Sequence, residues 1–306
     1  MENRKFCVYT ALFGNYEELN NQDVAKESNI DFICFTDDKD LYSETWNIVR
    51  IDPIFPLDPV RSARYFKITP HRHLPQYDTS LYIDNSVTLK VTPEEIFRDM
   101  LSNNFNLYCI KHSFRETVLD EYEEVLRLNY DKINVIVKQF NTYSLIDPSL
   151  FSQKPYWSGF MIRNHNNKQI INTMEDWLAQ VFHFSRRDQL SLNYAIRKNE
   201  IDVKEFDLDN SESKYHKWPT SHRYKSNTYN NSLSSSLESN MLIENIKENF
   251  EELEIELSNK KQYIQALNAQ LAERNREVLF YKLSKSWRFT RPFRKAMKVI
   301  RGKKND

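Results

Sequence analysis

The chain has 306 residues, 40% of them apolar, which is enough for one large or two smaller globular domains with a hydrophobic core. Its 43 basic residues balance its 43 acidic ones, so the overall charge gives no indication of a nucleic-acid-binding protein or of an enzyme that acts on acidic substrates, and no nucleic-acid partner is expected. The first residues lack the apolar stretch of a signal peptide, and no apolar run is long enough to span a membrane, so we expect a cytoplasmic protein.

Cysteine and glycine are both scarce. The three cysteines lie in short apolar runs, and their spacing matches no metal-binding pattern, which predicts buried free thiols in a reducing compartment. Only three glycines occur, at positions 14, 159 and 302. In so glycine-poor a sequence, a glycine indicates a special backbone angle or the close approach of a ligand.

Between residues 5 and 225, short β-rich runs alternate with helical stretches, a pattern that predicts an α/β layered domain. The expected strands cover 5–10, 31–36, 46–51, 79–84, 107–110, 156–163 and 203–206. The expected helices cover 59–69, 93–101, 117–128, 130–140, 169–183 and 189–198. Asp58 before Pro59, and Thr92 before Pro93, are typical of helix starts. The predicted domain therefore covers 1–225.

The segment 226–240 is rich in Ser and Asn and predicts a flexible linker. Beyond it, in 241–282, apolar residues recur at alternating steps of three and four, with only Lys260 and Arg274 interrupting. This spacing predicts a coiled coil and hence a homo-oligomer. A single amphipathic helix folded back on the domain is the alternative interpretation.

The C-terminal segment 283–306 mixes basic residues with aromatic ones, including Trp287, Phe289 and Phe293. Such a composition suits an anionic membrane surface, where basic side chains meet headgroups and aromatic rings enter the interface. A solvated tail, or a tail docked on a partner protein, explains the composition equally well.

Polar residues follow the first two predicted strands. The first strand is expected to end at Thr10, followed by Ala11 and by Gly14 in a turn, and the second ends in Asp37 and Asp38. Because ligands of α/β sheets bind at the carboxyl ends of strands, these residues are candidates for contacting a nucleotide. Ordinary turn formation is the simpler reading of each residue taken singly.

The strand at 79–84 ends in Asp84, Asn85 and Ser86. Carboxylate and hydroxyl oxygens at a strand end suit Mg²⁺ or Mn²⁺, although Asp-Asn pairs also form plain turns.

In the stretch before this strand, four basic side chains fall within about a third of the circumference of a helix: Arg61, Arg64, Lys67 and His71. These side chains could meet a diphosphate, or they could form a solvated basic face.

Two later features complete the candidate site. Gly159 lies inside a strand, where a glycine permits close approach of a ligand or simply better packing. Asp188 and Gln189 begin a predicted helix, and the alternative for Asp188 is an ordinary N-cap.

Taken in order, YTALFGNYEEL, the FTDD strand, KITPHRHLPQYDTSLYIDNS, YWSGFMIRNH and RRDQLSLNY resemble one known family. It is a glycosyltransferase-like family of bacteria and plants, long catalogued as a domain of unknown function, that includes plant mucilage-type glycosyltransferases. The resemblance covers residues 5–225. It implies a GT-A-like (Rossmann-like) mixed sheet flanked by helices, and it is similar more distantly to family 8 glycosyltransferases.

The resemblance also implies roles for particular residues. Asp84 matches the first aspartate of a metal site, and Asp188 with Gln189 matches a later catalytic pair. Ser86 stands where the related enzymes have a second metal-binding aspartate. A late histidine often completes such a site, and His216 and His222 are the candidates. The implied cofactor is a divalent cation, Mn²⁺ or Mg²⁺.

The reaction implied is transfer of a sugar from a nucleoside-diphosphate sugar to a hydroxyl of a glycan or lipid-linked acceptor. We expect this to serve bacterial surface polysaccharide synthesis at the inner face of the membrane. A non-catalytic sugar-binding or assembly module is the main rival interpretation. A lipid hydrolase is a third, but no GxSxG elbow or HExxH helix occurs.

Overall fold

A computed structural model describes residues 4–15, 17–100, 105–218, 233–285, 289–294 and 297. The chain divides into two compact units, Met1–Ile243 and Glu244–Asp306.

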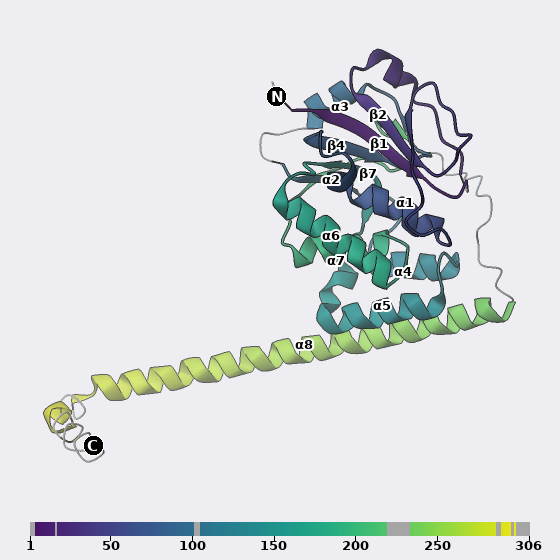
Figure 1. Ribbon diagram of the computed structural model, residues 1–306. Coiled ribbons are helices and arrows are strands. Elements are labelled where there is room, and N and C mark those ends of the chain that lie inside the picture. Colours follow the sequence, from purple (N-terminus) through teal and green to yellow (C-terminus); the bar gives the residue numbers. More distant parts are fainter. Residues whose placement is uncertain are drawn as a thin grey trace, which may run out of the picture. The chain divides into compact units, whose positions relative to one another are not determined.

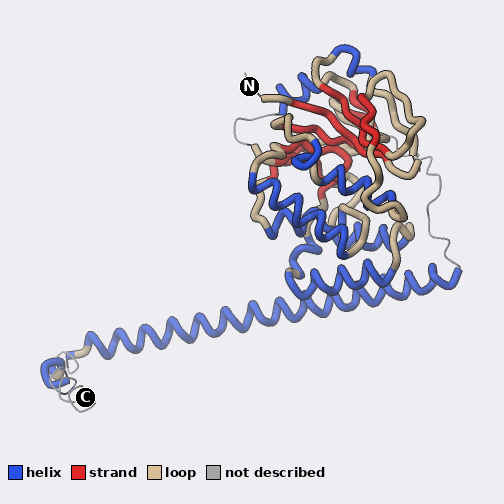
Figure 2. Tube along the Cα trace, viewed as in Figure 1, coloured by secondary structure: helices blue, strands red, loops and turns tan. Residues whose placement is uncertain are grey.

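The first unit is built on a seven-stranded mixed sheet with the order β3-β2-β1-β4-β7-β6-β8 (Figure 2). The strands β1 to β4 run parallel in this sheet, while β7 is antiparallel to both β4 and β6, and β8 is parallel to β6. The bounds are β1 Phe6–Leu12, β2 Asp31–Thr36, β3 Asn47–Arg50, β4 Thr79–Ile83, β6 Leu107–Lys111, β7 Tyr156–Arg163 and β8 Val203–Phe206. Each strand corresponds to one predicted run.

Helices flank the sheet, so the predicted fold class, a mixed sheet between helices followed by a C-terminal helix, is confirmed (Figure 1). The helices of this unit are α1 Pro59–Ile68, α2 Pro70–His73, α3 Pro93–Met100, α4 Val118–Arg127, α5 Ile133–Ile146, α6 Lys168–His183 and α7 Gln189–Lys198. Short 3-10 helices cover Asp23–Glu27 and Pro148–Ser152, and β5 Thr88–Leu89 pairs with β9 His216–Lys217. The predicted start of α1 is confirmed, because the Asp58 side chain accepts a hydrogen bond from the Arg61 N–H.

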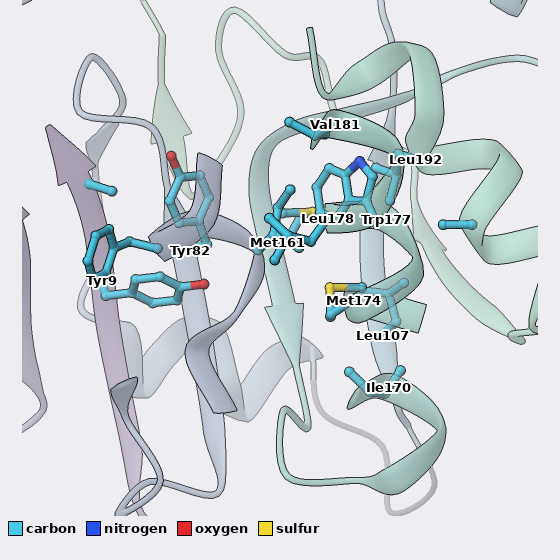
Figure 3. Packing of buried hydrophobic residues seen from close by; sticks show 14 of the residues in the cluster. Tyr9, Tyr82, Leu107, Met161, Ile170, Met174, Trp177, Leu178, Val181 and Leu192 are labelled. Atoms are coloured by element: carbon cyan, nitrogen blue, oxygen red, sulfur yellow. The ribbon is translucent and has the colours of Figure 1, made fainter. Parts of the chain in front are cut away.

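Two hydrophobic cores cover the two faces of the sheet. Alternate residues of β1 divide between them, with Cys7 and Tyr9 in one core and Val8 and Leu12 in the other, as the alternation of side chains along a strand requires. The first core contains the fully buried Trp177 and is packed from α1, α6 and α7 (Figure 3). The three cysteines are buried and free, as expected.

The strand β1 is longer than expected. It continues to Leu12, because Ala11 and Leu12 still pair with Phe35 and Thr36 of β2. The expectation that the strand ends at Thr10 is therefore wrong, and Thr10 and Ala11 lie buried inside the sheet.

The helix α8 covers Leu233–Leu283 and so begins inside the segment predicted as a linker. Residues 226–232 of that segment lie outside the described residues. None of the helices described is both long enough and apolar enough to cross a membrane.

Candidate functional site

The candidate site lies where the carboxyl ends of the parallel strands β1, β2 and β4 meet the beginning of β7. The first two strand-end loops are joined by Gly14, whose N–H donates to Asp37 Oδ1 at 2.9 Å. Gly14 has φ +75°, and a Cβ there would lie 2.5 Å from Pro59. The predicted special backbone angle at this glycine is thus confirmed.

Asp188 lies at the centre of the site. Its Oδ2 lies 2.7 Å from Lys67 Nζ and accepts from Ser158 Oγ at 3.0 Å, while its Oδ1 lies 3.0 Å from Arg64 Nε. The side chain is only 1% exposed. Burial alone would raise the pKa of Asp188, but Arg64, Lys67 and Arg187 together hold it below its usual range. Asp188 is therefore an ionised, fully paired carboxylate.

Asp84 extends this charge network toward solvent. Its Oδ1 lies 3.3 Å from Lys67 Nζ and accepts from the Tyr82 hydroxyl at 2.8 Å. Its backbone N–H donates to the Gly159 carbonyl at 3.0 Å. With a side chain 29% exposed, Asp84 is the carboxylate of the network that can reach a ligand.

Buried side chains of β1 and β7 fix the position of the Lys67 backbone. The Lys67 carbonyl, in the last turn of α1, accepts hydrogen bonds from the Tyr9 hydroxyl at 2.6 Å and from Arg163 Nη2 at 2.8 Å. Arg163 is wholly buried and also contacts the Ile68 carbonyl, so a cation faces the negative end of α1. The Lys67 ammonium also donates to Ser158 Oγ at 2.9 Å.

The hydrophobic core positions Asp188 in the same way. The indole N–H of Trp177, which is fully buried in α6, donates to the Asp188 carbonyl at 2.8 Å. The Asp188 side chain makes no N-cap hydrogen bond to α7, so the alternative reading of this residue as an ordinary cap is wrong. The neighbouring Gln189 is 5% exposed, and its Nε2 has no hydrogen-bond partner among the described residues.

A second buried carboxylate, Glu121 in α4, lies beside this network. Its side chain is paired with Arg187 at 3.2 Å and with Arg115 at 3.5 Å. Burial raises the pKa of Glu121, and the two arginines partly offset that shift. Burial also raises the pKa of Glu17, helped by the nearby Asp84 charge.

Several predicted donor contacts have structural partners instead. Arg61 donates to the carbonyls of Val181 and Phe184, and so ties α1 to the end of α6. Asp38 accepts from the Asp40 N–H in a turn. Asn85 is buried and donates to the Glu18 carbonyl at 3.1 Å.

Gly159 also has a packing role. A Cβ at this position would lie 2.5 Å from the Trp157 indole, so the missing side chain makes room for that ring. The packing alternative therefore explains this glycine.

Those expected metal ligands that the structure describes do not converge. His216 is fully buried, with Nδ1 bonded to Ser213 Oγ and Nε2 to the Asn210 carbonyl, which leaves no ring nitrogen for a metal. Ser86 Oγ accepts from the Trp218 indole at 3.2 Å, and His222 lies outside the described residues.

Among the described residues, no three His, Cys, Asp or Glu side chains are placed to hold a metal ion. A divalent cation at this site would therefore take Asp84 as a ligand and complete its coordination with phosphate oxygens of a bound ligand. Mg²⁺ is commonly held in this way.

The sequence did not point to Tyr82, Ser158, Trp177 or Glu121 as members of the site. Tyr82 and Ser158 lie within apolar strand runs, and Trp177 reads as a core residue of an amphipathic helix. Glu121 alone carried a signal, since a glutamate on the buried face of α4 breaks the amphipathic pattern and needs a partner.

The family described as "TOD1/MUCI70, glycosyltransferase-like domain" matches residues 1–214. Among curated proteins, none matches this sequence. Similar solved structures include the bifunctional glycosyltransferase WbbM, with 10% identity and a TM-score of 0.40, covering 67% of this chain and 39% of that chain. Mouse xyloside xylosyltransferase 1 has 10% identity and a TM-score of 0.39, covering 66% of this chain and 85% of that chain.

Proposed function

Because the chain belongs to the TOD1/MUCI70 glycosyltransferase-like family, we propose that it transfers a sugar from a nucleoside-diphosphate sugar to an acceptor hydroxyl. One observation carries this proposal. A buried network of Asp188, Lys67 and Arg64 ends in the partly exposed Asp84 at the carboxyl edge of parallel strands. This edge is where α/β sheets bind their ligands.

The network suits a reaction whose leaving group is anionic. Negative charge develops on the departing diphosphate, and cations held in a low-dielectric site stabilise such charge without reorganising. Lys67 is held by Ser158 and both carboxylates, and Arg64, 15% exposed, lies closer to solvent. We assign Arg64 and Lys67 to this electrostatic role, and Asp188 to holding both cations in place.

We further propose that a divalent cation, Mn²⁺ or Mg²⁺, is held by Asp84 together with the diphosphate of the donor. When bound, such an ion acts as a Lewis acid on the phosphate oxygens. Tyr82 and Lys67 orient Asp84 for this purpose, because both engage Oδ1, while no described residue forms a hydrogen bond or ion pair with Oδ2.

The acceptor we propose is a glycan or lipid-linked hydroxyl, as in bacterial surface polysaccharide synthesis. The basic, aromatic tail supports a site at an anionic membrane surface, since Phe289 and Phe293 are exposed at 81% and 70%.

A non-catalytic sugar-binding module is the second candidate. The observation in its favour is that both Asp188 oxygens are paired inside the protein, as in a purely structural ion cluster. The two candidates differ in whether bound donor is consumed.

The test is release of nucleoside diphosphate from a panel of nucleotide sugars by the full chain, with Mn²⁺ and a mixture of simple glycan acceptors. We expect one donor to be turned over, with at least about a hundredfold loss in Asp84→Asn, the scale of losing one transition-state interaction. The matched control is Asp202→Asn, whose side chain is 79% exposed and pairs, within the described ranges, with the neighbouring Lys204. Donor binding without any turnover would favour the non-catalytic module.

A further inference from the structure

The helix α8 carries an apolar stripe that no other described part of the second unit covers. The stripe consists of five aliphatic side chains that are each between 41% and 60% exposed: Leu257, Ile264, Leu267, Leu271 and Val278. They follow one another at steps of seven, three, four and seven residues, which places them along one narrow face of the helix. Exposed stripes of this kind are normally buried against another helix.

We propose that α8 forms a parallel, in-register, two-stranded coiled coil with a second copy of this chain. In heptad terms, Leu257, Ile264, Leu271 and Val278 occupy the first core position (a), and Leu267 occupies the second (d). β-Branched residues at the first position, as in Ile264 and Val278, together with leucine at the second favour two strands. The inference does not depend on the proposed transferase activity.

The charged residues that flank the stripe decide the orientation. Glu256 and Glu277 lie at the flanking g position, and Lys261 and Lys282 lie at the flanking e position of the next heptad. In a parallel pair, each g residue meets the e residue five positions further along the other helix. Glu256 then meets Lys261 of the second copy, and Glu277 meets Lys282, so both charged contacts are attractive.

An antiparallel pair of helices that overlap along the same stripe has less favourable contacts between its flanking charges. With Ile264 facing Leu267 of the second copy, e residues face e residues and g residues face g residues, so Lys261 lies beside Asn268 and Glu256 lies beside Glu277. Neither Glu256 nor Glu277 gains a lysine across that interface. The pattern of flanking charge therefore favours the parallel arrangement.

Two basic residues interrupt the stripe, and each is already paired on its own helix. Lys260 Nζ lies 2.5 Å from Glu256, and Arg274 Nη1 lies 2.9 Å from Glu277. In the parallel pair these glutamates bridge a core cation of one helix and a flanking lysine of the other. Polar residues at core positions lower the stability of a coiled coil but fix its register. We assign this register-fixing role to Lys260 and Arg274.

The arrangement has a consequence for the whole chain. The domain that precedes α8 is joined to the same end of the helix in both copies, and both tails follow the other end. At 1.5 Å per residue, the helix is about 75 Å long. Two basic tails would therefore start side by side, and a surface that binds one tail would gain from the presence of the second.

The first test combines sedimentation equilibrium of the full chain with a single cysteine in place of Val278. We expect twice the monomer mass, and we expect Val278→Cys to form a disulfide between copies under mild oxidation, since equivalent core positions face one another only in the parallel register. The wild-type chain is the control, because Cys7, Cys34 and Cys109 are buried. A monomer, or a dimer in which Val278→Cys fails to cross-link, would overturn the proposal.

The second test reverses the flanking charge. Lys261→Glu with Lys282→Glu replaces the attractive contacts of the parallel pair by Glu against Glu and leaves the Lys260 and Arg274 pairs intact. We expect the dimer dissociation constant to rise at least about tenfold in low salt. Arg276→Glu, on the opposite face of the helix, is the control and should leave it unchanged. Unchanged dimerisation in the doubly reversed variant would contradict the parallel arrangement.

Discussion

Lys67 Nζ and Asp188 Oδ2 lie 2.7 Å apart in an ion pair whose two side chains are each only 1% exposed. Removing one partner of such a pair leaves an uncompensated buried charge. We therefore expect Lys67→Met and Asp188→Asn each to lower the free energy of unfolding by about 3–5 kcal/mol. Urea denaturation of the full chain measures both.

The double variant separates this pair from its surroundings. Because each single change damages the same interaction, Lys67→Met with Asp188→Asn should cost less than the sum of the two, by at least about 1 kcal/mol. Strictly additive losses would show that the two side chains do not interact in solution, and would remove the basis for placing Lys67 beside Asp84.

Gly14 gives a prediction about the loop that joins β1 to the site. Gly14→Ala puts a Cβ 2.5 Å from Pro59 at a φ of +75°, so we expect a loss of about 1–3 kcal/mol in stability. The matched control is Asn15→Gly, because Asn15 has φ +49° and glycine adopts that angle without strain. Thermal unfolding of the two variants should separate clearly. Equal melting temperatures would contradict the geometry of this turn.

Buried histidines predict that the protein loses stability in mild acid. His165 is fully buried between Ser80 Oγ and the Leu74 carbonyl, and burial lowers its pKa to about 4. The unfolded chain binds a proton at this residue near pH 6.5 and the folded chain does not, so stability falls as the pH drops from about 6.5 toward 4.

The size of this effect can be measured by urea denaturation at pH 7 and pH 5. When the pH falls from 7 to 5, His165 should account for a decrease of about 1–2 kcal/mol in the free energy of unfolding. His165→Gln should lower stability at pH 7 but lose less on acidification than the wild type. A variant that loses as much as the wild type between the two pH values would show that His165 is not the group responsible.

The central strands of the sheet were predictable because they are buried on both faces. The runs at 31–36 and 156–163 are almost continuously apolar or small, and the observed β2 and β7 have the same bounds. The prediction failed at β1, where Thr10 was taken as the strand end although Ala11 and Leu12 continue the apolar run. Helix α2 was missed because four residues are too few to establish a helical period.

The candidate site was predictable only in part. The position of Asp84 at a strand end indicated a ligand site, and helical spacing grouped Arg64 with Lys67. No local pattern could show that these two side chains of α1 both pair with Asp188 at the start of α7. The N-cap reading of Asp188 rested on local preference and failed because three polar side chains from elsewhere in the chain compete for its oxygens. His216 was proposed as a ligand without knowledge of its two internal partners.

We propose above that Asp84 belongs to a site for a nucleoside diphosphate. Calorimetric titration of the full chain with common nucleoside diphosphates and their sugars, with and without Mn²⁺, tests it most directly, because a ligand of the folded state must bind measurably and raise its stability. We expect one nucleotide to bind and that binding to be lost in Asp84→Asn, while Asp202→Asn binds normally. If no nucleotide binds the folded wild-type chain, or if Asp84→Asn binds as tightly as the wild type, the account is contradicted.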